Sequence, residues 1–291
     1  MKKIINKAYK KAIKPFIGTG LSKKFPFKQI NKLMRKNFQP DILDFHGHKI
    51  MTDKVDSLGL SVNPDYEKTE IEFTKKIIKK GYKVLDIGAN IGTHTIILAE
   101  LVGEEGEVIA IEPDPYNFEL LLKNVELNKY EDRVKLIQAA GSNKEETISL
   151  YINEENRGDH RLYDTGEERK KIDVKTIIIG ELFRDNEKID YIKIDVQGAE
   201  QFVLEGMKKI LEQPQIKILL EFWPYGLKGM GSEPEKLIDY LTGYGFTLQE
   251  LGEETGELHK ITKEEILKKC EGKKYVNLYL TKEQKTQEET N

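Results

Sequence analysis

The sequence of 291 residues predicts an α/β fold built on a doubly wound, mostly parallel sheet. Two observations lead to this prediction. Short apolar runs alternate with segments of helical periodicity along most of the chain, which is typical of parallel strands joined by helices. The apolar run from Val84 to Ile87 is followed by a glycine-rich turn and then by a helical pattern from Ile91, as in a strand–turn–helix unit of such a sheet.

The other elements continue this alternation in chain order. A hairpin around Gly47 and a helix precede the central strand, and the remaining strands and helices follow it. We expect the hairpin at 42–51, helices at 70–80, 116–128, 199–211 and 235–241, and strands at 134–138, 147–152, 171–175, 189–195, 216–221, 246–251 and 274–280.

Charge divides the chain into a basic arm and an acidic body. The first 40 residues contain twelve Lys or Arg and no Asp or Glu, which leaves 35 basic and 50 acidic residues in the rest. Residues 2–17 predict a basic amphipathic helix, which suits an anionic membrane surface or docking on the domain. We expect a basic arm at 1–40, a hairpin and helix on the substrate side at 41–80, the main domain at 81–281, and a disordered polar tail at 282–291.

Composition excludes several classes of protein. No apolar run approaches the roughly 20 residues that span a bilayer, and lysines interrupt the N-terminus too often for a signal peptide. The single cysteine, Cys270, excludes an intramolecular disulfide. A cytoplasmic protein, with peripheral contact to the inner membrane face, is the expectation. Nucleic acid is a disfavoured partner because the acidic body repels phosphate and the arm lacks spaced aromatic residues.

The glycine-rich turn is a candidate ligand site. Asp86 lies at the carboxyl end of its strand, where open α/β sheets bind their ligands. Two glycines allow a tight turn and a close approach of a ligand, and the amides at the helix start favour polar groups. We expect contacts from Asp86, Gly88, Ala89, Asn90, Gly92 and Thr93. The alternative is a plain strand–turn–helix without a ligand.

A second acidic residue indicates a nucleoside ligand. Glu112 ends the next apolar run, 24 residues after Gly88, where a carboxylate can accept hydrogen bonds from both hydroxyls of a ribose. Small residues after the third strand would let an adenine ring lie flat. We therefore add Glu112, Pro113, Asp114, Ala139 and Ala140 to the expected contacts. A nicotinamide dehydrogenase is disfavoured because the third glycine of its usual motif is missing.

Polar residues also end two later strands at the same predicted edge of the sheet. Asp195 and Glu221 follow apolar runs, and Lys193 alternates with isoleucines before Asp195. Charges in a strand that is buried on both faces need partners or a role. An ion pair between Lys193 and Asp195, or a helix cap by Asp195, is the structural alternative.

These segments together resemble the FkbM family of S-adenosylmethionine-dependent methyltransferases. The matching pieces, over about 170 residues, are Asp86 to Gly92, Glu112-Pro113, Lys193 to Glu200, and Leu219 to Glu221. The resemblance, over residues 81 to about 251, implies a seven-stranded class I methyltransferase sheet, and we assign residues 81–281 to the methyltransferase domain. The family usually has Glu where Gln197 stands and often Tyr where His94 stands.

The family implies S-adenosylmethionine as cofactor and methyl transfer to oxygen. A hydroxyl acceptor must lose a proton, and His160, Asp195 and Glu221 are the candidate bases. His160 lies in the predicted polar loop, and Asp195 also lies nearest the expected methyl position, so it is a cofactor contact as well. Asp195 and Glu221 could instead hold a divalent cation through oxygen ligands.

The leading hypothesis is an O-methyltransferase that acts on a hydroxyl of a glycan, glycolipid or secondary-metabolite acceptor and reaches the membrane through residues 2–17. A nucleic-acid methyltransferase is the alternative enzyme, but Asp195-Val196-Gln197-Gly198 does not match the usual loop of enzymes that methylate adenine or cytosine nitrogen. The single cysteine, Cys270, lies far from this loop in the sequence, which excludes the usual position of the nucleophile in C5-cytosine methylation. A non-catalytic module that only binds S-adenosylmethionine is the third reading.

Overall fold

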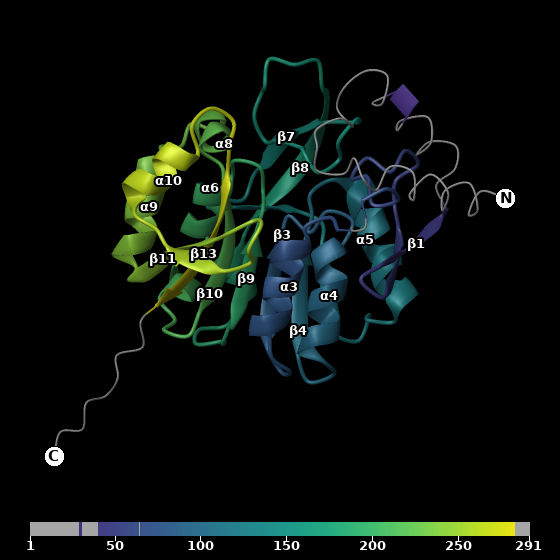
Figure 1. The fold of residues 1–291 in the computed structure, drawn as a ribbon, viewed down its shortest axis with the longest axis horizontal. Coiled ribbons are helices and arrows are strands. Elements are labelled where there is room, and N and C mark those ends of the chain that lie inside the picture. The colour runs from purple at the N-terminus through teal and green to yellow at the C-terminus, as the bar shows by residue number, and fades with distance from the viewer. Residues whose placement is uncertain (1–28, 31–39, 64, 283–291) are drawn as a thin grey trace.

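The structure is a computed structural model that describes residues 29–30, 40–63 and 65–282. The largest sheet forms its centre, with helices on both faces (Figure 1). The strands of this sheet are β3 (Lys83–Ile87), β4 (Glu107–Ile111), β5 (Val134–Ile137), β9 (Tyr191–Ile194), β10 (Lys217–Phe222), β11 (Phe246–Leu251), β12 (Leu258–Lys260) and β13 (Val276–Lys282).

The strand order of the main sheet is β12-β11-β13-β10-β9-β3-β4-β5. Strands β10, β9, β3, β4 and β5 pair in parallel, and β13 runs antiparallel to both β10 and β11. This order confirms the doubly wound, mostly parallel sheet. Strand β12 adds an eighth, edge strand to the seven that were expected. Its three residues are too few to give a pattern in the sequence.

One hydrophobic cluster lies on each face of the main sheet. Helices α3 (Lys68–Ile77), α4 (Thr93–Val102) and α5 (Pro115–Asn128) cover one face, and α6 (Glu200–Glu205), α7 (Lys208–Leu211), α9 (Pro234–Gly243) and α10 (Lys263–Lys269) cover the other. Side chains of β3 alternate between them: Val84 belongs to the first cluster, and Leu85 and Ile87 belong to the second. Burial on both faces explains why the middle of β3 is apolar and why polar residues, Lys83 and Asp86, occur only near its ends.

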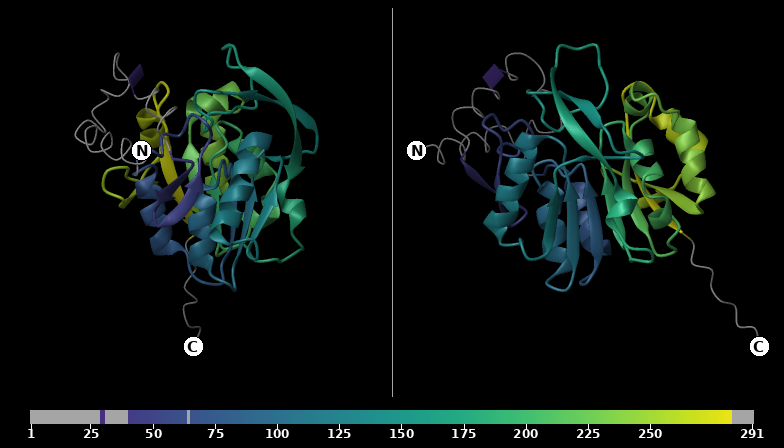
Figure 2. Two further views of the ribbon diagram at one scale, coloured as in Figure 1. Left: turned by 90° about the vertical axis from the view of Figure 1, so that its right-hand side faces the viewer. Right: turned by 180° about the vertical axis from the view of Figure 1, so that it is seen from behind.

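A smaller sheet stands beyond the carboxyl edge of the main sheet. Strand β8 (Lys170–Ile178) pairs in parallel with β6 (Ala140–Ser142) and antiparallel with β7 (Thr147–Ile152), which confirms the expected strand pair. The views in Figure 1 and Figure 2 show β7 and β8 projecting above the ends of the central strands. The irregular segment between these two strands therefore starts and ends near the candidate site.

The predicted hairpin is confirmed as β1 (Ile42–Phe45) and β2 (His48–Met51). Two asparagines of α5 bind the main chain of β2. The side-chain amide of Asn124 accepts from the Met51 amide at 2.6 Å and donates to the Met51 carbonyl at 3.0 Å, and Asn128 does the same for Lys49 at 3.0 and 2.7 Å. The hairpin thus packs on the helical layer. The residues that reach the site come from the segment after it.

The structure corrects several predicted boundaries. The helix expected at 199–211 is two helices, α6 and α7, because the chain turns at Gly206, where a Cβ would lie 2.0 Å from the Ser142 carbonyl oxygen. Strand β13 includes Lys282, which the sequence assigned to the tail. The predicted arm helix at 2–17 and the rest of the tail lie outside the described residues. Helix α8 (Pro224–Gly229), the 3-10 helix Ile179–Leu182, β6 and α10 were not expected.

None of the helices in the described ranges has the length and apolar character that a bilayer crossing requires.

Candidate active site

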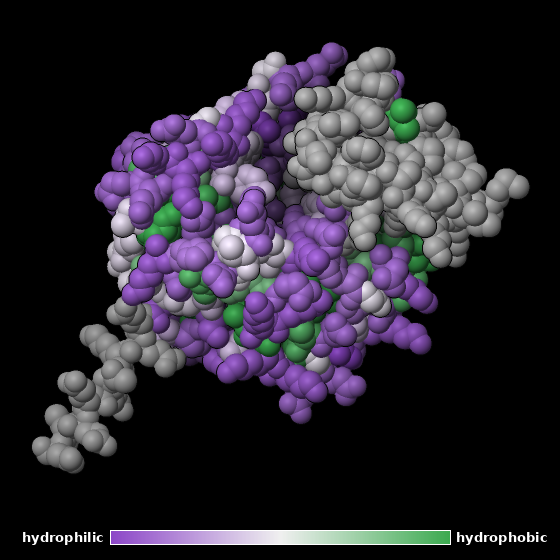
Figure 3. All heavy atoms as spheres, in the orientation of Figure 1, coloured by the Kyte–Doolittle hydropathy of each residue, from purple (hydrophilic) through white to green (hydrophobic). Residues whose placement is uncertain are grey.

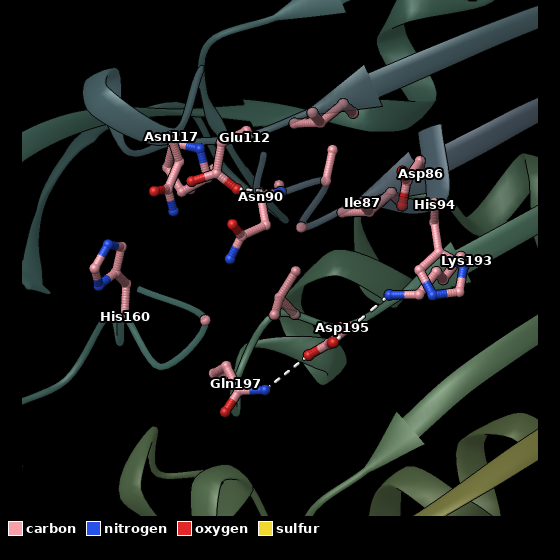
Figure 4. A pocket seen from close by; sticks show the side chains of 18 of the residues that line it. Asp86, Ile87, Asn90, His94, Glu112, Asn117, His160, Lys193, Asp195 and Gln197 are labelled. Atoms are coloured by element: carbon pink, nitrogen blue, oxygen red, sulfur yellow. Dashed lines mark hydrogen bonds and ion pairs between the residues drawn. The ribbon is translucent and has the colours of Figure 1, made fainter. Parts of the chain in front are cut away.

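The turns that follow β3, β4 and β9 line one cavity with an empty volume of about 830 Å³ (Figure 4). Parallel strands place their carboxyl ends at the same edge of a sheet, so residues far apart in sequence meet here. Asp86, Glu112 and Asp195 all line the cavity, as predicted from their positions at strand ends.

Asp86 is fully buried at the end of β3. Its Oδ2 accepts a hydrogen bond from the Thr95 hydroxyl at 2.6 Å, whereas Oδ1 has no hydrogen-bond partner among the described residues. A buried carboxylate oxygen without a partner is costly, so it marks a place where a polar ligand group would be stabilised.

The turn after Asp86 needs glycine at two positions. Gly88 has φ 84°, and a Cβ there would lie 1.8 Å from the Asp195 carbonyl oxygen. Gly92 has φ 91° and caps α4, and a Cβ there would lie 2.7 Å from Leu121 Cδ1. Both positions combine left-handed backbone with close packing, which a side chain would disrupt. The turns after β3 and β9 therefore touch through Gly88.

Glu112 is held by main-chain amides of two turns, those after β3 and β4. Its Oε2 accepts from the Asn90 amide and its Oε1 from the Asp114 amide, each at 2.9 Å. Burial outweighs these hydrogen bonds and raises the pKa of Glu112 to about 8. When Glu112 is ionised, each oxygen keeps a second acceptor position, which is what two neighbouring ribose hydroxyls require.

A segment between β7 and β8 closes over this side of the cavity. We call residues 153–161 the strap. The Arg157 carbonyl accepts hydrogen bonds from the side-chain amides of Asn90 at 3.0 Å and Asn117 at 3.1 Å. The Arg157 guanidinium lies 3.1 Å from Asp114 Oδ2 and 4.1 Å above the Tyr116 ring centre. The strap is therefore fastened to both the glycine turn and the start of α5.

His160 belongs to the strap and lines the cavity on the side away from Asp195 (Figure 4). Its Nδ1 accepts from the Asn153 amide at 3.0 Å, and its Nε2 lies 3.4 Å from Asp114 Oδ2. Both ring nitrogens thus face protein groups. The fold brings Asp195 and Glu221 together and leaves His160 apart from them.

Small residues form the floor of the cavity after β5. Ala139 and Ala140 line it and are almost fully buried, and Gly141 follows them. The predicted contacts Gly88, Ala89, Asn90, Thr93 and Pro113 line it too. Gly92 and Asp114 do not: Gly92 caps α4, and Asp114 caps α5 by accepting from the Asn117 amide at 3.1 Å.

Asp195 and Glu221 are bridged by a side-chain amide. Gln197 Nε2 donates to Asp195 Oδ1 at 2.7 Å and to Glu221 Oε1 at 2.9 Å. Lys193 Nζ lies 3.5 Å from Asp195 Oδ2, so the ion pair that was the structural alternative for this strand is present. Burial and the nearby negative charge of Asp195 raise the pKa of Glu221 well above its usual range.

Tyr66 and Glu67 form another wall of the cavity, and no pattern in the sequence predicted them. His94 Nε2 lies 2.7 Å from Glu67 Oε2, and Glu67 has φ 47° just before α3. Burial opposes ionisation of Glu67, but the hydrogen bond and positive charge of His94 outweigh it and lower the pKa of Glu67 to about 2. No motif surrounds Glu67, and only the fold brings it to the site.

The geometry offers the expected divalent cation no three-ligand site. In the part of the chain that the structure describes, no group of three or more His, Cys, Asp or Glu side chains is arranged to hold a metal ion. The Gln197 amide lies between the two carboxylates that were the expected ligands, Asp195 and Glu221.

The model of the FkbM methyltransferase domain matches residues 86–248, which is more than half of the chain. The chain belongs to the FkbM methyltransferase family. It is an S-adenosylmethionine-dependent methyltransferase, as the sequence resemblance implied. A second model, of protein-L-isoaspartate (D-aspartate) O-methyltransferase, matches residues 18–151, which cover less than half of the chain.

The individual proteins that the chain resembles share low identity with it or match only a part of it. The chain is similar to the methyltransferase sdnD of Sordaria araneosa, with 26% identity over 177 residues, half of this chain and 68% of that protein. It is 34% identical over 94 residues to a tRNA(Phe) (4-demethylwyosine(37)-C(7)) aminocarboxypropyltransferase of Pyrococcus horikoshii, of which it spans only 33%. An FkbM methyltransferase structure from Methylobacillus flagellatus superposes with a TM-score of 0.43 at 14% identity, covering 79% of this chain and 56% of that one.

Proposed function

We propose that this FkbM methyltransferase methylates a hydroxyl oxygen of a small-molecule or glycan acceptor, such as a glycan, glycolipid or secondary metabolite. The observation that supports this best is a second cavity, a groove of about 1510 Å³, that adjoins the cofactor cavity. Asp195 and Gln197 line both, and Glu221 lines the groove. A carboxylate pair thus lies where an acceptor in the groove would meet the cofactor.

The cofactor cavity fits S-adenosylmethionine. The free buried oxygen of Asp86, the close backbone at Gly88, the Glu112 carboxylate and the alanine floor each suit a part of a polar adenosine ligand. We propose that Glu112 holds the ribose hydroxyls, that Ala139 and Ala140 lie against the adenine, and that the start of α4 holds the remaining polar groups. When bound, this cofactor supplies a methyl group that is activated by its sulfonium sulfur.

The chain's own residues then orient and deprotonate the acceptor. The hydroxyl proton passes to Glu221, because a base with a raised pKa suits proton abstraction near neutral pH. Asp195, paired with Lys193, accepts a hydrogen bond that aligns the hydroxyl. Fixed alignment of the two reactants supplies much of the acceleration in such a displacement.

The groove favours an acceptor that is uncharged or positively charged. Its described lining has seven carboxylates and three basic side chains. Two of the bases are already paired, Lys68 with Asp65 at 3.0 Å and Arg161 with Asp159 at 2.7 Å. Figure 3 shows hydrophilic residues gathered around a hollow beside the lobe of α8 to α10. Phosphate-rich nucleic acid would be repelled here, which supports a hydroxyl acceptor over a nucleic-acid base.

The experiment measures transfer of labelled methyl groups from S-adenosylmethionine to matched methyl glycosides: a glucoside, a glucosaminide and a glucuronide. We expect O-methyl products from the first two and little from the glucuronide. Glu221→Gln should lower the rate at least about 100-fold, the usual contribution of a general base. The exposed residue Glu235 gives a control, because Glu235→Gln should not change it. Methylation of RNA or DNA in preference to every glycoside would contradict the proposal.

Residues 2–17 support a further part of the proposal, cytoplasmic location with peripheral contact to an anionic membrane. The segment alternates lysines with apolar residues, which suits an interfacial helix. Deletion of residues 2–17 should remove salt-sensitive binding to phosphatidylserine-containing vesicles and leave the affinity for S-adenosylhomocysteine unchanged. Vesicle binding that survives the deletion would exclude this role.

A further inference from the structure

Gln197 occupies a position that the proposed mechanism does not yet use. It lies in the turn after β9, lines both the cofactor cavity and the groove, and points its amide nitrogen at Asp195 (Figure 4). The same nitrogen donates to Glu221. Its neighbours Asp195 and Glu221 are acceptors, so the nitrogen of the amide must face them. One side chain therefore joins the carboxyl ends of two adjacent parallel strands.

The backbone at this turn is constrained. Gln197 has φ 54°, a left-handed conformation that costs a non-glycine residue on the order of 1 kcal/mol or more. The next residue, Gly198, has φ 111°, and a Cβ there would lie 2.5 Å from the Gly226 carbonyl oxygen of α8. The Gly198 amide donates to Glu200 Oε1 at 3.0 Å. Packing around this turn thus holds Gln197 in a left-handed backbone conformation that is unfavourable for a residue with a side chain.

Several charged and titratable groups surround the bridged pair. The groups that interact electrostatically with Asp195 or Glu221 are Lys193 of β9, Glu67 and Tyr66 before α3, Glu200 of α6 and Tyr275 before β13. Lys193 favours the ionised pair, while Glu67 and Glu200 oppose it. In this acidic surrounding, an uncharged donor that binds both carboxylates at once stabilises their close approach.

We propose that Gln197 is a positioning residue, whose amide holds Asp195 and Glu221 together as one proton-accepting pair and sets the pH at which that pair ionises. The inference rests on the proposed function, in which Glu221 accepts the hydroxyl proton while Asp195 aligns the hydroxyl. The oxygen keeps the electron pair of the broken O–H bond for its bond to methyl. The methyl–sulfur bond of the donor would break with its electron pair on sulfur, so that S-adenosylhomocysteine leaves. Hydrogen bonds to ionised carboxylates lower their pKa values, so loss of the amide donor must shift ionisation of the pair to higher pH.

The test follows the carboxyl groups directly and needs no acceptor. The full chain, labelled with ¹³C at Asp and Glu carboxyls and saturated with S-adenosylhomocysteine, is titrated by NMR, with Asp195→Asn and Glu221→Gln to assign the signals. Gln197→Met keeps the length of the side chain and removes the donor. It should raise the upper titration midpoint of the pair by about one pH unit. Gln197→Glu adds a third carboxylate and should raise it further, and Gln249→Met in β11 is the control.

The outcomes separate this inference from the proposed function. An unmoved midpoint in both Gln197→Met and Gln197→Glu, with S-adenosylhomocysteine still bound, would overturn the role of Gln197. If one variant fails to fold, the other decides. With an active glycoside, the acid limb of kcat should move with the NMR midpoint, which a merely structural role would not cause. Full activity of Glu221→Gln would instead contradict the proposed base, whatever the Gln197 variants show.

Discussion

The cofactor cavity and the groove are built in different ways. About half of the residues that line the cofactor cavity lie within residues 86–141, at the ends of β3 and β4 and in the segments that follow β3, β4 and β5. The groove is lined by short segments spread from Ser57 to Tyr275, which meet only in the folded chain. Short sequence motifs can predict a cavity that is made by successive strand ends. They cannot predict a groove that is made by loops far apart in the sequence. The cofactor is therefore easier to predict than the acceptor.

The largest expected effect tests the point where the two regions touch. Gly88→Ala would place a Cβ 1.8 Å from the Asp195 carbonyl oxygen, in a left-handed conformation, so one turn must move away from the other. We expect the affinity for S-adenosylhomocysteine to fall more than about 100-fold by calorimetry, since overpacking and strain each cost 1–3 kcal/mol.

Gly243→Ala is the matched control, because a Cβ there meets no atom within 4 Å and the residue ends a helix with ordinary φ. If Gly88→Ala bound the ligand like the wild type, the close contact between the two turns would have no functional importance.

Glu200 gives a pH-dependent effect on stability. It is fully buried beneath the turn 195–198, its Oε2 has no hydrogen-bond partner among the described residues, and burial raises its pKa to about 7. A folded pKa above the ordinary 4.5 means that this contribution to stability is complete below pH 4.5 and is lost as the pH rises through 7.

Between pH 5 and pH 8 the free energy of unfolding from this group should fall by about 2 kcal/mol. Urea unfolding of the wild type and Glu200→Gln measures it, and the variant should lack this part of the slope. Equal slopes in the two proteins would show that Glu200 is ionised in the folded state.

Glu112→Ala tests the cofactor side alone. Loss of the carboxylate removes the proposed ribose contacts and the partners of two main-chain amides, so the Kd for S-adenosylhomocysteine should rise about tenfold or more. Calorimetry with adenine as a second ligand sharpens the result, because adenine has no ribose and should lose less. An equal loss for both ligands would place the adenine, rather than the ribose, at Glu112.

The smallest effect belongs to the groove. The Glu253 carboxylate lines it, is exposed, and forms no ion pair with a described residue. Glu253→Gln should raise KM for a methyl glucosaminide by about two- to threefold, as expected for an exposed charge, and leave kcat and cofactor affinity unchanged. A change in kcat instead of KM would mean that Glu253 acts on the chemical step.

The sequence predicted the residues whose positions are fixed by a strand end and the turn after it. Asp86, Gly88 and Glu112 line the cavity because each lies at the end of its strand or just after it. Asp195 and Glu221 meet because their strands are adjacent and parallel. Their bridge by Gln197 depends on a left-handed backbone that no pattern shows.

Other site residues depend on long-range packing. Glu67 pairs with His94 across 27 positions, and the strap reaches Asn90 and Asn117 from a loop beyond β7. Neither segment has a periodicity or motif from which its contact could be predicted. The predicted role of His160 remains a prediction, since its two ring nitrogens face Asn153 and Asp114 in the structure.

Trp223, the single tryptophan of the chain, lines the groove, and its indole nitrogen donates to the Lys273 carbonyl at 3.1 Å. Arg161, the last residue of the strap, lies 4.8 Å above its ring centre. One intrinsic fluorophore therefore touches both a basic residue that lines the groove and the C-terminal segment that completes it. We therefore expect the tryptophan emission of the unmodified enzyme to change when an acceptor enters the groove, without background from any other indole.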